Sequence, residues 1–432
     1  MYESKKQQQR FDANEIKRVI LVGTYTSNRD KEECYEHLKE LNSLSYTYNF
    51  DVIKEIACPI KRFNPATYIG SGKLNEIKII MEEESIDCII FDNEISPNQQ
   101  KNIEEIIGKP VLDRNELILE IFAARAKTKE ALLQIELAKI HYQLPRLKRL
   151  WTHLSREKSS GSATGTMRGG GEKQIEVDRR ICKQRANVVE KELLAVREQR
   201  GTQRHARRKV GTPTFAIVGY TNAGKSSLLN ALTKSDVLVE NKLFATLDTA
   251  SRQMTLPNKQ NIILIDTVGF IRKLPHFLVE AFKSTLEESV FTDVLVHVID
   301  ASSPSALENG QITLEVLHGL GVVDKPIITV LNKIDQCTDQ SIIEKLTNKY
   351  HKTVLMSITK SIGFERLLDL MQEEIKNLRK IVNLRIPQSN YNLVSELMKE
   401  GRVICSSYED DDILIEIEIP IKLEHKVQQF II

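Results

Sequence analysis

The sequence contains little that would tie it to a membrane, a disulfide framework or a metal cluster. Its 432 residues include one tryptophan and six cysteines. The cysteines are scattered, without a Cys-x-x-Cys pair or a histidine at ligand spacing, which excludes common metal motifs and indicates free thiols in a reducing compartment. No apolar run approaches the roughly 20 residues that span a bilayer, and no secretory leader follows Met1. We therefore expect a cytoplasmic protein, soluble or peripheral.

The charge of the chain is nearly balanced overall but unevenly distributed. The 61 lysines and arginines and 59 aspartates and glutamates leave a net charge of +2. Residues 146–209 hold 18 basic and 7 acidic residues, an excess of 11, so the rest of the chain must carry −9 to give that total. A basic segment on an acidic remainder favours a nucleic-acid partner. A solvated helix face is the alternative interpretation of such a run.

Length and pattern predict a multidomain α/β protein. At roughly 100–200 residues per domain, the length suggests about three domains. Apolar runs alternate with helical patterns over 1–115 and again over 211–380, which predicts two α/β domains with mainly parallel sheets. In 381–432 a helical pattern precedes a strictly alternating strand, so we expect a small α+β domain. Four isoleucines share one face of that strand: Ile413, Ile415, Ile417 and Ile419.

Residues 116–210 predict a helical hairpin. One helical pattern runs from Glu116 to about Leu154, interrupted at Pro145, and another runs from about Lys173 to Arg200. Between them lies "SSGSATGTMRGGGEKQ" (159–174), whose glycines and serines argue against a regular helix. The basic stretch "RHARRKVGTP" follows as a hinge. Two long helices joined by a flexible basic tip would form an αα-hairpin that projects from the body.

One short motif carries phosphate chemistry. "GYTNAGKS" (219–226) fits Gly-x-x-x-x-Gly-Lys-Ser, and it follows an apolar strand and opens an apolar helix, as this motif requires. Its glycines let backbone N–H groups approach phosphate oxygens. Lys225 would supply a cation to the β- and γ-phosphates, and the hydroxyl of Ser226 would bind Mg²⁺.

A second motif, "DTVG" (266–269), ends the next strong strand. Asp266 can hold the Mg²⁺ shell there, and the N–H of Gly269 can sense a γ-phosphate. Thr246, in "FATLD", lies between the two motifs, where a switch threonine would bind Mg²⁺; a chance loop threonine is the alternative. Phe270 follows Gly269, and a phenyl ring cannot orient water by hydrogen bonding. We therefore expect slow intrinsic hydrolysis that a partner or another loop completes.

A third motif, "NKID" (332–335), predicts the base. The Asp335 carboxylate can accept two parallel N–H bonds from guanine, a pair that adenine cannot offer, so the motif favours GTP over ATP. Asn332 can bridge base and loop, and Lys333 can lie over the ring. In "MSITK" (356–360) a backbone N–H near Ser357 could meet the guanine oxygen, although an ordinary strand end fits that segment equally well.

These motifs define the predicted site, with GTP or GDP and Mg²⁺ as its ligands. Catalytic roles go to Lys225, Thr246 and Gly269, and Mg²⁺ binding goes to Ser226, Thr246 and Asp266. The predicted nucleotide-binding residues are Gly219, Tyr220, Thr221, Asn222, Ala223, Gly224, Lys225, Ser226, Ser227, Phe244, Ala245, Thr246, Asp266, Thr267, Val268, Gly269, Asn332, Lys333, Asp335, Ser357 and Ile358.

Together with three further stretches, these motifs resemble the HflX family of ribosome-associated P-loop GTPases. The further stretches are "NPATYIGSGKLNEI" (64–77) with "IIFDNEISPNQQKNIE" (89–104), "VLDRNELILEIFAARAKTKEALLQIELAKIHYQLPRL" (111–147), and "LWTHLSR" (150–156) with "GEKQIEVDRR" (171–180). The resemblance covers nearly the whole chain. It implies an N-terminal α/β domain (1–115), the αα-hairpin (116–210), a P-loop GTPase domain (211–380) and a small C-terminal domain (381–432), in a chain that we expect to be a monomer.

The resemblance also implies binding to the large ribosomal subunit and the splitting or rescue of stalled ribosomes. The hairpin tip would reach ribosomal RNA near the peptidyl-transferase region, where Arg156, Lys158, Arg168 and Lys173 would meet phosphates. Gly170 stands where the family usually has proline, and a variant tip could suit ribosomes stalled by an antibiotic. ATP use by the N-terminal domain is implied too. No local motif supports it, because "YIGSGKL" lacks the first glycine of a P-loop.

Other functions stay open at this point. A GTP-gated switch that binds ribosomal RNA without remodelling fits the same residues. A tRNA-modifying enzyme would need a cysteine or cofactor site, for which the sequence shows no candidate, and an ATP-dependent RNA remodeller is a weaker alternative.

Overall fold

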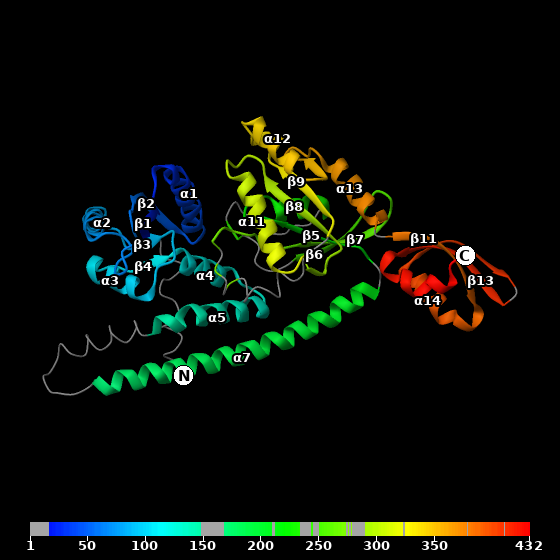
Figure 1. Cartoon of the computed structure of the whole chain (residues 1–432), viewed down its shortest axis with the longest axis horizontal. Coiled ribbons are helices and arrows are strands. Elements are labelled where there is room, and N and C mark those ends of the chain that lie inside the picture. The colour runs from blue at the N-terminus through cyan, green and yellow to red at the C-terminus, as the bar shows by residue number, and fades with distance from the viewer. Residues whose placement is uncertain are drawn as a thin grey trace. The chain divides into compact units, whose positions relative to one another are not determined.

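The computed structural model describes residues 17–147, 168–209, 212–233, 243–244, 250–273, 275, 278, 290–322, 325–377, 379–409 and 411–432 (Figure 1). The chain divides into two compact units. Unit 1 comprises the described residues within Met1–Leu193, Glu240–Leu247 and Lys273–Phe282, and unit 2 comprises those within Leu194–Val239, Asp248–Arg272 and Lys283–Ile432. The finer division into four domains stays a prediction.

Unit 1 is built around a four-stranded sheet in the order β2-β1-β3-β4, and every strand pair is parallel. This confirms the parallel α/β pattern predicted for the N-terminal part. The buried strands β1 and β3 are apolar on both faces because helices cover both sides. The elements are β1 (Lys17–Tyr25), η1 (Asn28–Asp30), α1 (Lys31–Thr47), β2 (Phe50–Pro59), α2 (Ser71–Glu83), β3 (Cys88–Phe91), α3 (Pro97–Ile107) and β4 (Val111–Asp113).

Local signals fix the ends of α3. Ser96 is the N-cap, and its hydroxyl accepts a hydrogen bond from the backbone N–H of Gln99, whose side chain in turn accepts from the N–H of Ser96. Pro97 occupies the first turn, where its missing N–H costs nothing. Gly108 ends the helix with a φ of +74°, which glycine adopts without strain. The predicted serine cap and proline start are confirmed.

The predicted first arm of the hairpin is two helices rather than one. α4 (Arg114–Arg125) ends at Ala126, whose backbone is extended, and α5 (Lys129–Gln143) starts afresh. Thr128 caps α5 by accepting a hydrogen bond from the N–H of Ala131, so the continuous helix predicted from Glu116 was wrong at this break. The interruption at Pro145 is confirmed, because the short helix η2 (Leu144–Arg146) follows α5.

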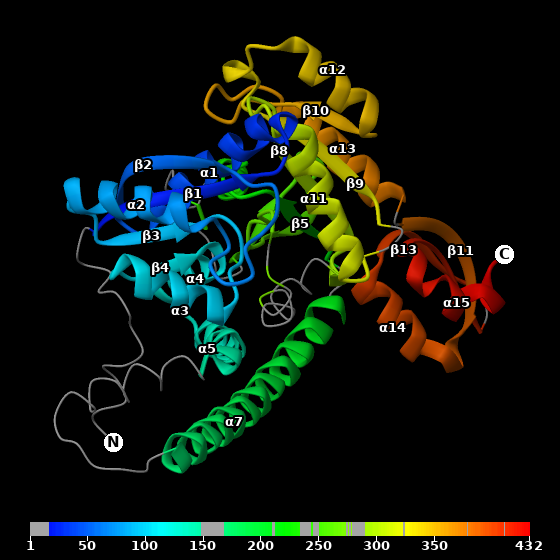
Figure 2. The ribbon, with the colours of Figure 1, turned by 60° about the vertical axis from the view of Figure 1, so that its left-hand side comes forward.

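The second arm is the 42-residue helix α7 (Arg168–Lys209), longer at both ends than predicted. Residues 168–172, expected in an irregular tip, are helical, as is the predicted hinge up to Lys209. Helix growth is cooperative, so a long helix can extend through poor formers such as these glycines. Residues 159–167 of the tip lie outside the described residues. α5 and α7 lie side by side (Figures 1 and 2) and share a small core: Leu133, Leu137, Ile140, Ala186, Val189 and Leu193.

Unit 2 contains a six-stranded sheet in the order β10-β9-β8-β5-β7-β6. All neighbours are parallel except β6, an antiparallel edge strand that the sequence analysis missed. Residues of α8 and α13 join the main core on one face, and residues of α11 and α12 pack in a second cluster with β8 and β9. The elements are β5 (Thr214–Gly219), α8 (Lys225–Thr233), β6 (Ala250–Thr255), β7 (Asn261–Asp266), β8 (Val294–Asp300), α11 (Ala306–Gly319), β9 (Ile327–Asn332), η3 (Ile334–Gln336), α12 (Gln340–Lys349), β10 (Thr353–Leu355) and α13 (Phe364–Asn377).

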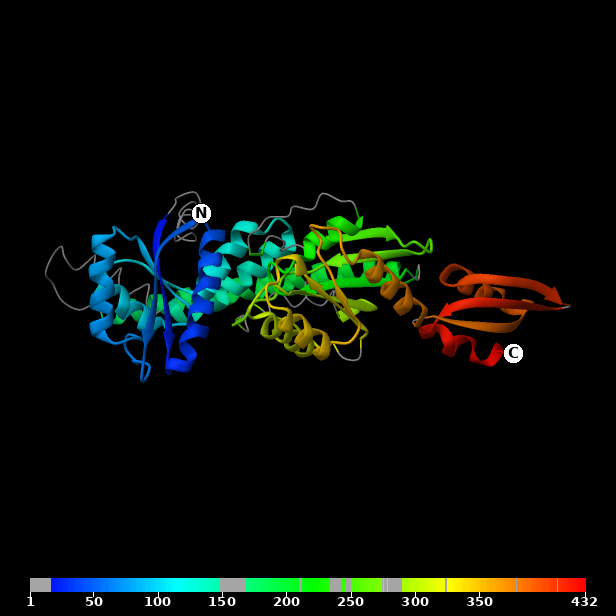
Figure 3. The same cartoon turned by 90° about the horizontal axis from the view of Figure 1, so that it is seen from above.

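The C-terminal part of unit 2 forms an antiparallel sheet in the order β11-β13-β12 (orange to red in Figure 3). The four isoleucines predicted to share one face of β13 are all buried. The expected strand and preceding helix are confirmed, and two further strands complete the sheet. The elements are β11 (Arg379–Pro387), η4 (Gln388–Asn390), α14 (Tyr391–Glu400), β12 (Arg402–Glu409), β13 (Asp412–Pro420), η5 (Ile421–Leu423), α15 (Glu424–Val427) and η6 (Gln428–Phe430). Within the described ranges, none of the helices combines the length and apolarity needed to cross a bilayer.

Candidate nucleotide site

The loop between β5 and α8 bends at two glycines that its backbone requires. Gly219 has a φ of +155° and Gly224 a φ of +101°. A Cβ atom would lie 2.2 Å from the carbonyl oxygen of Val298 at the first position and 2.3 Å from Nδ2 of Asn332 at the second. No side chain therefore fits at either place. α8 begins at Lys225 directly after the bend. The N–H groups of its first turn, which lack acceptors within the helix, therefore lie next to this loop.

The ammonium group of Lys225 is buried beside this loop. The residue is 7% exposed, and its Nζ donates a hydrogen bond of 2.7 Å to the carbonyl oxygen of Tyr220. Burial lowers the pKa of Lys225 to about 8, against the opposing effect of the Asp266 charge. A phosphate would stabilise this cation far more than a neutral carbonyl does, because its negative charge would replace the hydration that burial has removed.

The two predicted Mg²⁺ ligands of unit 2 meet. The Ser226 hydroxyl on α8 donates a hydrogen bond of 2.7 Å to Oδ2 of Asp266, which lies fully buried at the end of β7. Hydroxyl and carboxylate oxygens are ligands that Mg²⁺ prefers, and a P-loop serine with such a carboxylate is the pair that holds it in nucleotide sites. The donor set therefore fits this ion.

The segment that follows Asp266 lies against the P-loop. A Cβ on Gly269 would lie 2.9 Å from Cα of Thr221 and 3.0 Å from Nζ of Lys225, so the contact with the P-loop backbone favours a glycine here. Phe270 donates from its N–H to the carbonyl oxygen of Gly219 (3.1 Å) and accepts from the N–H of Thr221 (2.8 Å). Its ring is 1% exposed. The predicted phosphate loop and γ-phosphate sensor are thus joined by two backbone hydrogen bonds.

Thr267 and Val268 hold this segment in the fold through their side chains. The Thr267 hydroxyl donates to the carbonyl oxygen of Ile217 on β5 at 2.7 Å, and Val268 is 5% exposed. Any contribution that they make to nucleotide binding would come from their backbone.

Asn332 links three of the predicted segments. Its Nδ2 donates to the carbonyl oxygen of Ala223 in the P-loop at 2.9 Å, and its Oδ1 accepts from the N–H of Ile358 at 3.4 Å. The side chain thus fixes the P-loop relative to the "MSITK" turn.

Asp335 lies beside Ser357. The neighbouring Ser357 side chain is the main reason why the pKa of Asp335 is held below its ordinary value. Ser357 is fully buried, and its hydroxyl also accepts from the N–H of Lys360 at 3.2 Å. Asp335 is therefore an acceptor-only carboxylate at neutral pH, as recognition of the two guanine N–H groups requires.

The positions of the other predicted residues say less about nucleotide binding. Asn222 is exposed in the P-loop with a φ of +59°, and Ser227 is half-buried on α8. Ala245 and Thr246 lie outside the described residues. Phe244 belongs to unit 1, where its ring meets that of Phe122 edge to face, with 4.6 Å between ring centroids. Their roles in nucleotide binding stay predictions.

The sequence analysis overlooked Asp300, the last residue of β8. Its Oδ2 accepts a hydrogen bond of 2.7 Å from Nζ of Lys333. The available signal was positional: Asp300 pairs with Asn332 in the parallel register, and parallel strands end at a common edge.

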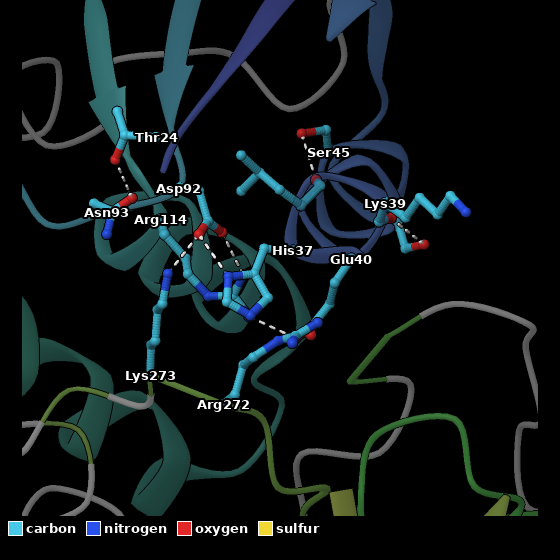
Figure 4. Close-up of polar contacts among 12 residues, drawn as sticks. Thr24, His37, Lys39, Glu40, Ser45, Asp92, Asn93, Arg114, Arg272 and Lys273 are labelled. Carbon is cyan, nitrogen blue, oxygen red and sulfur yellow. Dashed lines mark hydrogen bonds and ion pairs between the residues drawn. The ribbon is translucent and has the colours of Figure 1, made fainter. Parts of the chain in front are cut away.

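Unit 1 has its own charged cluster at the carboxyl end of β3 (Figure 4). Asp92, 2% exposed, accepts from Nη1 of Arg114 at 2.9 Å and from Nζ of Lys273 at 2.6 Å, and His37 lies 3.8 Å away. Arg114 also bonds Glu40. Burial opposes ionisation of Asp92, but the Arg114 and Lys273 charges outweigh it and hold its pKa below the ordinary value.

Comparison with known proteins agrees with this geometry. Residues 35–123 match the family described as "GTP-binding GTPase N-terminal", residues 125–207 "GTP-binding GTPase Middle Region", and residues 214–333 "50S ribosome-binding GTPase". The "GTPase HflX" of Chlamydia pneumoniae is 46% identical over 96% of this chain and 88% of its own. That of Caldanaerobacter subterraneus subsp. tengcongensis is 42% identical over 97% and 95%.

Among solved structures, a GTP-binding protein from Sulfolobus solfataricus in complex with GDP is 30% identical over 84% of this chain and 100% of its own, with a TM-score of 0.43. That score is too low to assign the fold by structural similarity, so the family is assigned from the sequence matches. Their identity extends over almost the full length of both chains. The chain is therefore a GTPase of the HflX family.

Proposed function

We propose that this GTPase acts on the ribosome: it binds the large subunit through its basic hairpin and uses GTP to split or rescue stalled ribosomes. Mg²⁺ would be held by Ser226 and Asp266, where it would neutralise charge on the phosphates. The proposal places the protein in the cytoplasm as a monomer. The description "50S ribosome-binding GTPase", which the sequence of residues 214–333 matches, supports this partner.

The RNA-binding part of the proposal is supported by α7, which has an apolar face and carries exposed cations on the rest of its surface. Ala186, Val189 and Leu193 pack against α5, and Arg185 forms two hydrogen bonds with Glu136 of α5, at 2.5 and 2.8 Å. The helix is thereby fixed with another part of its surface outward.

Exposed cations on α7 include Arg179, Arg180 and Lys183. None of the three has an ion-pair partner among the residues that the structure describes. A fixed helix that presents exposed cations is suited to a phosphate backbone, because binding releases the counterions condensed on the nucleic acid.

GTP turnover with and without large subunits tests the proposal. We expect strong stimulation by large subunits, since Phe270 cannot orient the attacking water. Replacing 159–167 by a glycine–serine linker leaves α7 intact and should abolish stimulation while basal turnover stays unchanged. Unchanged stimulation would show that the tip is not the coupling element.

A charge test addresses α7. Changing Arg179, Arg180 and Lys183 to glutamine should weaken ribosome binding and lower the slope of log affinity against log salt by about 2–3, at roughly 0.7–0.9 per lost phosphate contact. Arg185→Gln, which breaks the hairpin ion pair instead, is the matched control and should leave the salt slope nearly unchanged.

Subunit separation decides between remodelling and simple binding. If GTP and a non-hydrolysable analogue both support docking but neither separates the subunits, the protein is an RNA-binding switch and the splitting role is wrong. Antibiotic rescue is the most specific part of the proposal. It would be contradicted if a strain that lacks the protein kept its sensitivity to drugs that bind the peptidyl-transferase region.

A further inference from the structure

Asp300 at the end of β8 forms an ion pair with Lys333, which follows β9. Oδ2 of Asp300 accepts from Nζ of Lys333 at 2.7 Å. Its other oxygen, Oδ1, accepts from both the N–H (3.0 Å) and the hydroxyl (2.6 Å) of Ser302. Both oxygens are therefore engaged, and the carboxylate cannot rotate without breaking these bonds. The two charged side chains are only partly buried, 22% exposed for Asp300 and 24% for Lys333.

The backbone conformation at Lys333 also restrains this ion pair. Lys333 has a φ of +62°, in the left-handed region that non-glycine residues rarely adopt. That bend ends β9 and starts η3, which contains Asp335. Lysine has a long flexible side chain that loses much rotamer freedom when it is ordered. Asp300 holds the far end of that side chain while the backbone bend holds the near end.

We propose that Asp300, braced by Ser302, is a positioning residue for guanine nucleotides: it sets the Lys333 side chain in place to cover the face of the purine before the nucleotide arrives. This rests on the proposed guanine site at Asp335. The gain is preorganisation, because the entropy of ordering the side chain is lost on folding and not on binding. Asp300 does not touch the nucleotide itself in this role.

A purely structural role for the pair is less well supported. β8 and β9 are already joined from Leu295–Ile327 through Asp300–Asn332 by their parallel ladder, and the N–H of Ala301 adds a 2.9 Å bond to the carbonyl oxygen of Asn332. A partly exposed ion pair adds little to such a junction. Its position at the base-recognition motif is what a ligand-directed role requires.

A double-mutant cycle on the full-length chain tests the inference, with GDP affinity measured by calorimetry. Asp300→Ala should weaken GDP binding about tenfold in the wild-type background and less than twofold in a Lys333→Ala background. Asp300→Asn, which keeps one acceptor oxygen but loses the charge and the second acceptor, should recover at most a small part of the loss. Equal losses in both backgrounds would overturn the inference, because Asp300 would then act independently of Lys333.

Two controls separate this inference from its premises. Asp339, whose Oδ1 accepts from the N–H of Ser341 at 2.9 Å, caps α12, and Asp339→Ala should leave GDP affinity unchanged. Asp335→Asn reports on the guanine site itself. If it loses affinity while Asp300→Ala does not, the positioning role alone fails; if it also leaves GDP affinity intact, the guanine site is misassigned.

The base offers a further distinction. Inosine diphosphate lacks the exocyclic amine that guanine presents to Asp335 but has the same ring face. Asp300→Ala should therefore weaken both nucleotides by the same factor, whereas Asp335→Asn should weaken GDP more. A loss at Asp300 confined to GDP would contradict a role on the ring face.

Discussion

The two largely parallel sheets of this chain differ at the edge where the carboxyl ends of their strands lie. In unit 2, β5 leads into a loop whose glycines, Gly219 and Gly224, adopt positive φ and surround a buried lysine. In unit 1, the corresponding first strand ends near Gly23, where a Cβ would lie 2.8 Å from Sγ of Cys34. That glycine allows α1 to pack closely on β1. The glycines of unit 2 allow a loop to bend, whereas Gly23 of unit 1 allows a helix to pack closely against a strand.

The buried charges at the two edges also differ in their partners. Asp92 in unit 1 is neutralised by cations of the protein, which hold its pKa low. Lys225 in unit 2 has a neutral carbonyl oxygen as its hydrogen-bond acceptor, and burial lowers its pKa to about 8. The buried charge at the first edge is neutralised by the protein itself, whereas an anionic ligand would neutralise the buried lysine at the second. A shared topology thus does not imply a shared function, and ATP use by unit 1 stays a prediction.

Removing the P-loop lysine should produce the largest effect. Lys225→Ala should weaken GTP binding by at least about 100-fold, roughly 2.7 kcal/mol, because the phosphates lose their fixed cation. Lys73 of "GSGK" in unit 1 is the matched control: it pairs with Glu76 at 2.6 Å, and Lys73→Ala should leave GTP affinity unchanged. Calorimetry on both variants checks this. Retention of affinity within tenfold in Lys225→Ala would contradict the phosphate role.

The base preference should change next. Asp335→Asn removes the acceptor for two guanine N–H groups and should weaken GTP binding about 100-fold, at roughly 1.5 kcal/mol or more for each hydrogen bond to the charged carboxylate. Xanthosine triphosphate presents a carbonyl in place of the amine and should gain affinity for the variant. Competition between the two nucleotides measures the exchange of preference. A variant that still selects guanine would place base recognition elsewhere.

Nucleotide binding should take up a proton at alkaline pH. The pKa of Lys225 is about 8 in the free protein, and bound phosphates would raise it. Above pH 8 the free lysine loses its proton, so affinity should fall with rising pH, approaching about tenfold per pH unit. Calorimetry at pH 8.5 in buffers of different ionisation enthalpy measures this uptake. An affinity that does not change between pH 7.5 and 9.5 would rule out a deprotonating lysine.

A smaller effect concerns acid stability of unit 2. His297 on β8 is fully buried, neither ring nitrogen has a hydrogen-bond partner in the described structure, and burial lowers its pKa to about 3. Because its unfolded pKa is higher, near 6.5, its contribution to stability is present above pH 6.5 and is lost as the pH falls toward 3. Between pH 6.5 and 5 the loss should be about 2 kcal/mol.

His297→Phe should remove that loss. The measurement is the difference between the unfolding midpoints at pH 7 and pH 5, compared between wild type and variant, so that any change in packing cancels. Asp113 of unit 1 provides the opposite case, since burial raises its pKa to about 6 and its contribution favours stability below that value. If His297→Phe leaves the pH dependence of the midpoint unchanged, other groups control acid unfolding.

Short-range signals made much of the fold predictable. The apolar runs became β1, β3, β5, β7, β8 and β9, and the serine–proline start of α3 and the bend at Gly219 lay where expected, because each depends on residues adjacent in sequence. The edge strand β6 was missed because its exposed, polar residues give no apolar run. The break at Ala126 was missed because its helix-forming neighbours outweighed the weak signal of Thr128 as a cap.

Contacts between distant residues account for what the sequence could not predict in the site. Asn332 meets Ala223 across 109 positions, and Asp300 meets Lys333 only because β8 and β9 end together. The motif residues were found because their spacing is fixed by local loops. Asp300 belongs to no such loop, and its role depends on the register of two strands.

The buried ring of Phe270 limits how this enzyme could be altered. Its two backbone groups are fastened to the P-loop and its side chain is 1% exposed, so a glutamine placed there would bury its amide and not present it to water. An unsatisfied amide would cost about 1–3 kcal/mol of folding free energy. A single substitution at this position should therefore not speed hydrolysis. The loop would have to change its conformation before a new side chain could contact the solvent.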